Sequence, residues 1–277
     1  MRPKTIDKSN IVKPCFAYPG GKTRLLDQLL PLIPEHSRYL EPFAGGLAVL
    51  LAKPRAKVEV INDLDSEVAN FYRYVRYHFD ALVSELGQHL SSREDFELLK
   101  ANPGHTDLQR ACRWYLLKVM SFGGMSGTFG RAVSSFTGFD RQRHIELIRS
   151  VADRLNRVVV ESQDWEKVVE FYDTPDSFHF FDPPYVNCGA TAYRPFTEFD
   201  MQRVRDCLDA LQGNWILTCD DSSQCRAIFK GLPIKKTAVR YSTENKRAAK
   251  KTKQARQNFG ELIVIDPRIA PASAKAA

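Results

Sequence analysis

The sequence predicts an α/β fold in which parallel strands alternate with helices. Two runs rich in β-branched and aromatic residues, 58–62 and 178–181, each end directly in an aspartate. This is typical of buried parallel strands whose carboxyl ends open onto a ligand site. A third such run, 38–41, is followed by a glycine pair, and apolar residues at helical spacing separate the runs. Strand and helix therefore alternate along the chain.

Composition narrows the class of protein. The chain has 277 residues, of which 43% are hydrophobic and 26% are charged, as is ordinary for one or two globular domains. Its net charge of +7 favours a polyanionic partner. The six cysteines form no Cys-x-x-Cys pair, so we expect reduced thiols, no metal site and a cytoplasmic location. We expect no membrane association, because no apolar run is long enough to span a membrane.

The first glycine turn, residues 18–23, precedes a predicted helix over 25–33. Its Gly-Lys-Thr triplet is similar to part of a P-loop, but that motif requires a glycine at position 16, where this chain has Phe16. The spacing therefore argues against a nucleoside triphosphatase. What remains is a helix N-terminus with exposed amides beside Lys22, which suits a bound carboxylate.

The second glycine turn lies between two predicted strands. The run 38–41 leads to Gly45-Gly46, a helix follows over 47–51, and the next strand ends in Asp63. A strand, a glycine turn, a helix and an acid roughly 20 residues later form the Rossmann arrangement. In that arrangement Asp63 would accept hydrogen bonds from the ribose hydroxyls of a nucleoside-bearing cofactor.

The middle of the chain, residues 66–121, shows helical spacing without strand alternation, which predicts a helical insertion. It ends in a glycine-rich loop over 121–131 that carries Arg131, and a basic helix follows over 141–155. Such a loop either enters a DNA groove or is a mobile surface loop, and the residues alone leave both interpretations open.

The second half of the chain returns to alternating elements. We expect a helix from Asp164-Trp165, another over 200–211, and strands over 157–161, 178–181, 215–218, 234–241 and 262–265. A basic run between the last two strands contains Lys250, Lys251 and Lys253. Such a run is usually a solvated loop, but beside a nucleic-acid cleft it would bind phosphates.

The most informative stretch is Asp182-Pro183-Pro184-Tyr185, directly after the run 178–181. Two prolines cannot continue a hydrogen-bond ladder, so the chain leaves the sheet stiffly and its carbonyls point outward. An acid, rigid carbonyls and an aromatic ring at a strand end suit a planar amine, held between hydrogen-bond acceptors and a stacking face.

These motifs, in this order, resemble the Dam-type (class D12) adenine-specific DNA methyltransferases, which methylate the N6 amine of adenine. The resemblance covers about residues 15–266 and implies S-adenosylmethionine as the cofactor and double-stranded DNA as the partner. It also implies a Rossmann-like methyltransferase sheet with a helical target-recognition insertion. The corresponding divisions are a catalytic domain at 15–70 and 151–266, an insertion at 71–150, and flexible termini at 1–14 and 267–277.

The resemblance also assigns roles to single residues. It places Asp182, Pro183 and Tyr185 in catalysis: the carboxylate and the Pro183 carbonyl accept the amine hydrogens, and the ring stacks on a base flipped out of the duplex. The implied cofactor contacts are Tyr18, Lys22, Glu41, Phe43, Gly45, Asp63, Asp164 and Trp165. The predicted DNA contacts are Arg131, Lys250, Lys251 and Lys253.

Two positions depart from the family pattern: Tyr18 stands where tryptophan is frequent, and Leu47 where a small residue is frequent. Methylation of a cytosine N4 amine needs the same acceptor geometry, although many such enzymes carry serine in place of Asp182. RNA and protein-glutamine methylation also occur on related tetrapeptides. A catalytically inactive DNA-binding protein of the same fold is the alternative from another class. The recognition sequence, the oligomeric state and the presence of a cognate restriction enzyme are left open by the sequence.

Overall fold

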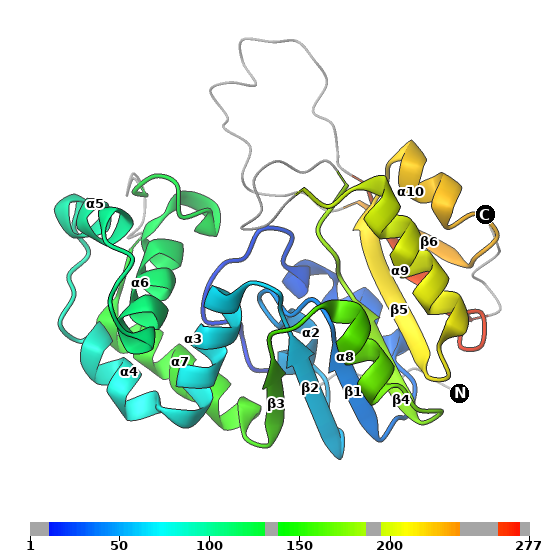
Figure 1. Cartoon of the computed structure of the whole chain (residues 1–277), viewed down its shortest axis with the longest axis horizontal. Helices are drawn as coiled ribbons and strands as arrows, with labels where there is room; N and C mark the ends of the chain where they lie inside the picture. Colours follow the sequence, from blue (N-terminus) through cyan, green and yellow to red (C-terminus); the bar gives the residue numbers. More distant parts are fainter. Residues whose placement is uncertain (1–10, 131–137, 187–194, 239–259, 272–277) are drawn as a thin grey trace, which may run out of the picture.

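The computed structural model describes residues 11–130, 138–186, 195–238 and 260–271 of the chain. A seven-stranded sheet forms its centre, with helices on both faces (Figure 1). In spatial order the strands are β3 (Val158–Glu161), β2 (Val58–Asn62), β1 (Arg38–Glu41), β4 (Ser177–Phe181), β5 (Asn214–Asp220), β7 (Gly260–Ile265) and β6 (Ile234–Ala238). The first five are parallel, and β7 is antiparallel to both of its neighbours. This confirms the predicted α/β, Rossmann-like sheet.

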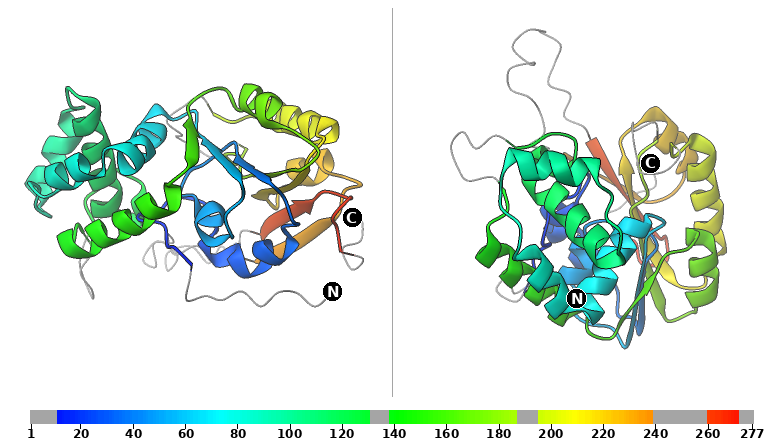
Figure 2. Two further views of the ribbon diagram at one scale, coloured as in Figure 1. Left: turned by 90° about the horizontal axis from the view of Figure 1, so that it is seen from below. Right: turned by 60° about the vertical axis from the view of Figure 1, so that its left-hand side comes forward.

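Successive residues of each strand face opposite helix layers. On β1, Tyr39 belongs to one buried cluster and Leu40 to the other, and Phe180 and Phe181 of β4 divide in the same way. One face is covered by α8 (Trp165–Tyr172), α9 (Glu198–Ala210) and α10 (Ser223–Ile228). The other is covered by α2 (Ala48–Ala52) and by the short turns η2 (Lys22–Leu25), α1 (Leu26–Leu29) and η3 (Leu30–Leu32) (Figure 2). Burial on both faces explains why successive residues of β4 and β5 are buried, without the alternation of a half-exposed strand.

The strand order reverses at β1. The chain passes from β1 to β2 and β3 on one side and returns to β4 on the other. Tyr39 of β1 lies opposite Glu59 of β2 and Phe178 of β4, so the three strands are held in register. Open α/β sheets bind ligands outside the carboxyl ends of their strands at such a reversal. Glu41 ends β1 and Asp182 directly follows β4, so both lie at this reversal, and the region around these strand ends is called the crevice below.

Five helices lie beyond the β3 side of the sheet (Figures 1 and 2). They are α3 (Ser66–Tyr77), α4 (Phe79–Leu86), α5 (Arg93–Ala101), α6 (Asp107–Met120) and α7 (Arg141–Leu155). The rings of Phe71 and Tyr115 stack at 5.1 Å, which joins α3 to α6. Because α3 crosses residue 70 without a break, the division of the chain at 70/71 stays a prediction.

Three details differ from the sequence-based expectation. The helix predicted over 25–33 is broken into η2, α1 and η3, where Pro31 lacks the amide that a regular helix would use. The short helix α10 was not predicted. Residues 11–14 and 267–271 were expected to be flexible. They include Val12, Ile269 and Ala270, which pack against the buried cluster that contains Tyr39. In the part of the chain that the structure describes, no helix is long and apolar enough to cross a bilayer.

Candidate active site

A buried ammonium group forms the centre of the crevice. Lys22 is only 3% exposed, and its Nζ lies 2.6 Å from Asp182 Oδ1 and 3.0 Å from Glu261 Oε1. It also donates a hydrogen bond of 2.6 Å to the Gly20 carbonyl. A buried charge is tolerated only when it is paired and hydrogen-bonded, and these acceptors meet that need. The first glycine turn, the end of β4 and the start of β7 are thereby joined.

Tyr185 is attached to the same centre. Its hydroxyl donates to Glu261 Oε1 at 2.7 Å, and Lys22 Nζ lies 3.4 Å from the hydroxyl oxygen and 5.3 Å from the ring centre. Pro183 is buried and Tyr185 is partly exposed. The catalytic tetrapeptide predicted from the sequence therefore has its acid and its aromatic ring fixed by one lysine and one glutamate.

Asp182 keeps one oxygen open. Both Lys22 and Thr218 donate to Oδ1, the hydroxyl of Thr218 at 2.8 Å. Among the described residues no hydrogen bond to Oδ2 is found, and the side chain retains 21% of its surface. Burial raises the pKa of Asp182, the Lys22 ammonium opposes this rise, and the Glu261 carboxylate adds to it. Oδ2 can accept a further donor.

Glu261 and Thr218 were not predicted from the sequence. Glu261 is 1% exposed within the apolar strand β7, and Thr218 is fully buried in β5. The signal for Glu261 was a single acid within an otherwise apolar strand, since burying an unpaired carboxylate is costly. Thr218 has no comparable signal, because threonine is common in strands.

Glu41 lies at the end of β1 without a hydrogen-bonded cation among the described residues. Its Oε1 accepts hydrogen bonds from the Tyr39 hydroxyl at 2.5 Å and from the Leu50 amide at 2.7 Å. Burial raises the pKa of Glu41 to about 7, although both hydrogen bonds lower it. Glu41 therefore fixes the start of α2 from beneath the second glycine turn.

Asp63 connects the turns that follow β1 and β2. Its two carboxylate oxygens accept the amides of Gly45 and Asp65, each at 2.9 Å. Burial raises the pKa of Asp63 to about 7, the Gly45 amide lowers it, and the carboxylate of Asp65 raises it. The side chain is still partly exposed at the crevice, so it can accept hydroxyl groups as well as orient the glycine turn.

Tyr18 explains why a glycine stands at position 45. A Cβ atom on Gly45 would lie 3.0 Å from the Tyr18 ring, and the residue has a φ of 46°. The ring therefore packs on the glycine turn. The neighbouring Leu47 also has a positive φ, of 56°, and its side chain is buried in the core.

The remaining predicted cofactor residues have structural contacts. Phe43 is partly buried between the rings of Trp165 and Phe196, at 5.7 and 6.2 Å. Asp164 caps α8 by accepting the Glu166 amide at 3.0 Å. Trp165 is only 6% exposed in the core beneath Phe43. Asp164 thus has a capping role, and most of the Trp165 indole is enclosed by protein.

Comparison with protein families identifies the chain. The model of the D12 class N6 adenine-specific DNA methyltransferases matches residues 18–248. The chain belongs to this family.

Individual relatives agree with the family assignment. Type II methyltransferase M1.LlaDCHI of Lactococcus lactis subsp. cremoris is 29% identical over 250 residues, which span 81% of this chain and 87% of the relative. Type II methyltransferase M.MjaIII of Methanocaldococcus jannaschii is 28% identical over 222 residues, 68% of this chain and 75% of the relative. The DNA N-6-adenine-methyltransferase of Escherichia phage P1 is 24% identical over 180 residues, 61% of this chain and 24% of that protein.

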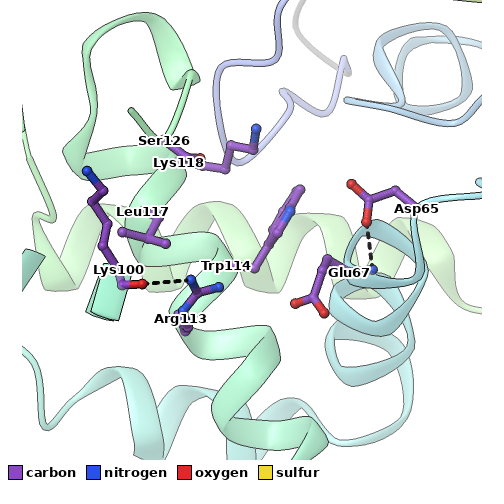
Figure 3. Close-up of a pocket in the computed structure, with 8 residues that line it drawn as sticks. All are labelled: Asp65, Glu67, Lys100, Arg113, Trp114, Leu117, Lys118 and Ser126. Carbon is purple, nitrogen blue, oxygen red and sulfur yellow. Dashed lines mark hydrogen bonds between the residues drawn. The ribbon is translucent and has the colours of Figure 1, made fainter. Parts of the chain in front are cut away.

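This D12 methyltransferase also has a pocket on its helical side. It has a volume of about 330 Å³ and lies between the start of α3, the end of α5 and α6 (Figure 3). Its lining residues are Asp65, Glu67, Lys100, Arg113, Trp114, Leu117, Lys118 and Ser126. Lys118 Nζ lies 5.2 Å from the centre of the Tyr18 ring and 5.5 Å from that of Trp114, so the pocket adjoins the glycine turn.

The glycine-rich loop after α6 lies beside the same region. A bridge between Ser121 and Phe129 closes its base, and Gly124 approaches the segment before Tyr18. A Cβ atom on Gly124 would lie 2.1 Å from the Ala17 carbonyl oxygen. The loop base is therefore packed against the site.

The predicted DNA contacts lie outside the described residues. These are Arg131, Lys250, Lys251 and Lys253. Within the described ranges, no group of three or more histidine, cysteine or acidic side chains could hold a metal ion. Methylation at a cytosine ring carbon would require a cysteine nucleophile with a lowered pKa. Cys15 does not fit this role, because it is buried and burial raises the pKa of its thiol.

Proposed function

We propose that this adenine-specific DNA methyltransferase transfers a methyl group from S-adenosylmethionine to the N6 amine of an adenine flipped out of double-stranded DNA. The observation that carries this proposal is the arrangement of Asp182: one oxygen is occupied by Lys22 and Thr218, and the other is available to an incoming amine. A base within a duplex cannot reach such a crevice, so it must leave the stack, at a cost of a few kcal/mol.

The residues of the crevice fit the proposed cofactor. Asp63 is partly exposed at a strand end and can accept ribose hydroxyls. Lys22, Asp182 and Glu261 together carry one excess negative charge when both acids are ionised, which suits a ligand with a positively charged sulfur. Tyr18 and Phe43 are partly exposed, Glu41 is buried beneath the second glycine turn, and we propose all three as part of the cofactor site. When bound, S-adenosylmethionine supplies a methyl group activated by that charge.

The chain itself positions the amine. The nitrogen lone pair of adenine's amine is conjugated with the ring, so the amine is a poor nucleophile. Asp182 Oδ2 and the Pro183 carbonyl would each accept one amine hydrogen and hold the nitrogen toward tetrahedral geometry. The amine must lose one proton when it gains the methyl group, and Asp182 Oδ2 is the acceptor we propose. Tyr185 would stack on the flipped base, a contact worth about 1–3 kcal/mol if single-strand values apply.

The substrate assignment has a direct test. Purified protein, S-adenosylmethionine and mixed-sequence duplex DNA are incubated, and the DNA is sequenced with detection of modified bases. We expect N6-methyladenine at one defined sequence. N4-methylcytosine in its place would support the cytosine alternative, and no methylation together with retained DNA binding would indicate an inactive binding protein.

Asp63 tests the cofactor site separately. Asp63→Ala should weaken S-adenosylmethionine affinity by about 10- to 100-fold, because hydrogen bonds to a charged acceptor contribute about 1.5–3 kcal/mol. Calorimetric titration measures this change. Asp63→Asn is the milder variant, since its single acceptor oxygen can keep one of the two contacts, to the Gly45 or the Asp65 amide. Unchanged binding in Asp63→Ala would remove the ribose role.

The setting follows from the substrate. DNA is reached in the cytoplasm of a bacterial or phage-infected cell, where we place the protein. The relatives from Lactococcus and Methanocaldococcus are named type II methyltransferases, which supports a cognate restriction enzyme as a partner in the cell.

A further inference from the structure

We infer that Glu261 is a positioning residue for methyl transfer, which fixes the Tyr185 ring and shares the Lys22 ammonium with Asp182. This inference rests on the proposed function and deepens it. Glu261 comes from β7, far in the sequence from both the glycine turn and the catalytic tetrapeptide.

The sheet holds Glu261 in a fixed position. β7 lies between β5 and β6, and Glu261 is opposite Asp220 on one side and Thr237 on the other. Strands paired on both sides hold a side chain more precisely than a loop does. The carboxylate is 1% exposed in a strand otherwise made of glycine and aliphatic residues, where an acid costs stability unless it is paired. For Glu261 these partners are the Lys22 ammonium and the Tyr185 hydroxyl.

One oxygen of Glu261 accepts two donors. Oε1 accepts the Tyr185 hydroxyl at 2.7 Å and lies 3.0 Å from Lys22 Nζ. Tyr185 follows two prolines and is partly exposed. The hydrogen bond to Glu261 anchors the end of the ring that is farthest from the backbone. A ring fixed in this way loses less freedom when a base stacks on it.

Glu261 also changes the electrostatic surroundings of Asp182. Lys22 is within 3.0 Å of two carboxylates, so its single charge does not fully neutralise Asp182. Among the residues that the structure describes, the charged or titratable groups around Asp182 include Lys22, Glu261, Glu41, Tyr18 and Tyr185. Of these, Lys22 lowers the pKa of Asp182 and Glu261 raises it. Without the Glu261 charge, Lys22 would pair with Asp182 alone, and the pKa of Asp182 would fall.

Two substitutions separate position from charge. Glu261→Gln keeps an oxygen for the Tyr185 hydroxyl and removes the charge, whereas Glu261→Leu removes both. We expect kcat to fall about 10-fold in Glu261→Gln and about 100-fold in Glu261→Leu, with the KM for S-adenosylmethionine unchanged. In Glu261→Gln the acidic limb of the kcat profile should move to lower pH, since Asp182 then loses its proton more readily.

A double-mutant cycle tests the route through Tyr185. Tyr185→Phe removes the hydroxyl and keeps the ring, so Glu261→Leu with Tyr185→Phe should be no slower than Glu261→Leu alone. Tyr172→Phe is the matched control, because Tyr172 donates a similar hydrogen bond of 2.9 Å to Glu161 on β3, at the edge of the sheet. It should leave kcat and the pH profile unchanged.

Several results would overturn the inference. One is wild-type kcat and pH profile in both Glu261 variants, and another is a double variant whose loss is the product of the single losses. If Glu261→Leu does not fold, Glu261→Gln still decides through its pH profile. Failure of wild-type protein to methylate any DNA would instead refute the proposed function, so the two failures are distinguishable.

Discussion

Two buried ionic clusters lie on this sheet, and they have opposite balances of charge. Near the start of β2, Glu59 is bound by two cations: Arg154 donates to both of its oxygens at 2.6 and 2.9 Å, and Lys53 Nζ lies at 2.7 Å. At the crevice, Lys22 serves two carboxylates, Asp182 and Glu261. The first cluster has an excess of one positive charge, and the second has an excess of one negative charge.

The pKa values of the acids in the two clusters shift in opposite directions. Burial alone would raise the pKa of Glu59, but the hydrogen bonds and charges of Arg154 and Lys53 lower it to about 2. For Asp182 burial also raises the pKa, and here Lys22 offsets only part of the rise. A cluster that holds the fold together surrounds its acid with donors, whereas the crevice leaves Asp182 Oδ2 open among the described residues. An excess of acceptors is therefore the physical mark of the site.

Glu59→Gln tests the difference between the two clusters with the largest expected effect on stability. The change leaves Lys53 and Arg154 buried without their carboxylate, which should lower the free energy of unfolding by about 3–5 kcal/mol. Urea unfolding followed by circular dichroism measures this loss. Methylation per folded molecule should stay at the wild-type value below the melting transition, because Glu59 lies away from the crevice. A loss under about 1 kcal/mol would mean that the two clusters do not differ as described.

Asp182→Ala should have the opposite effect, with a large loss of methylation rate and little loss of stability. Lys22 keeps Glu261 and the Gly20 carbonyl as partners, so no buried cation is left unpaired and the unfolding transition should change little. The methylation rate should fall about 100- to 1,000-fold, which is the usual cost of removing one preorganised hydrogen-bonding group. Initial rates with labelled S-adenosylmethionine measure the fall, and calorimetry should find cofactor affinity largely retained.

The matched control for this variant is Asp221→Ala. Asp221 follows β5 as Asp182 follows β4, but it forms ion pairs with Arg226 and Lys236 at the surface. Its loss should leave the methylation rate near the wild-type value. Near-wild-type methylation by Asp182→Ala would contradict the proposed role of the carboxylate.

The fold could be predicted because its causes are local. Apolar runs and glycine turns predicted the strands, and α7 begins and ends at the predicted residues. The same local signals indicated Asp182 and Tyr185, since a double proline must end a strand. Glu261 could not be placed, because its neighbours depend on the pairing of β7 between β5 and β6 rather than on spacing along the chain. The helix pattern at Trp165 likewise did not indicate how deeply its indole would be buried.

Glu41 provides a third case, because it is a buried carboxylate with no hydrogen-bonded cation among the described residues. It is 2% exposed, and burial raises its pKa from 4.5 to about 7. The folded protein therefore binds a proton on Glu41 between these values that the unfolded chain releases. Stability contributed by this proton is present below about pH 4.5 and is lost as the pH rises through about 7. The direction is opposite to that of Glu59, whose lowered pKa stabilises the fold at neutral pH.

Glu41→Gln should remove this pH dependence. Glutamine keeps an oxygen for the Tyr39 hydroxyl and the Leu50 amide, and it has the shape of the protonated acid. Relative to wild type, we expect the variant to gain on the order of 1–3 kcal/mol in unfolding free energy between pH 5 and pH 8. Urea unfolding of both proteins at each pH measures the difference, and other titrating groups such as Asp63 cancel in it. An equal pH dependence in the two proteins would mean that Glu41 is already ionised in the fold, and that a buried acid here needs no hydrogen-bonded cation to hold its charge.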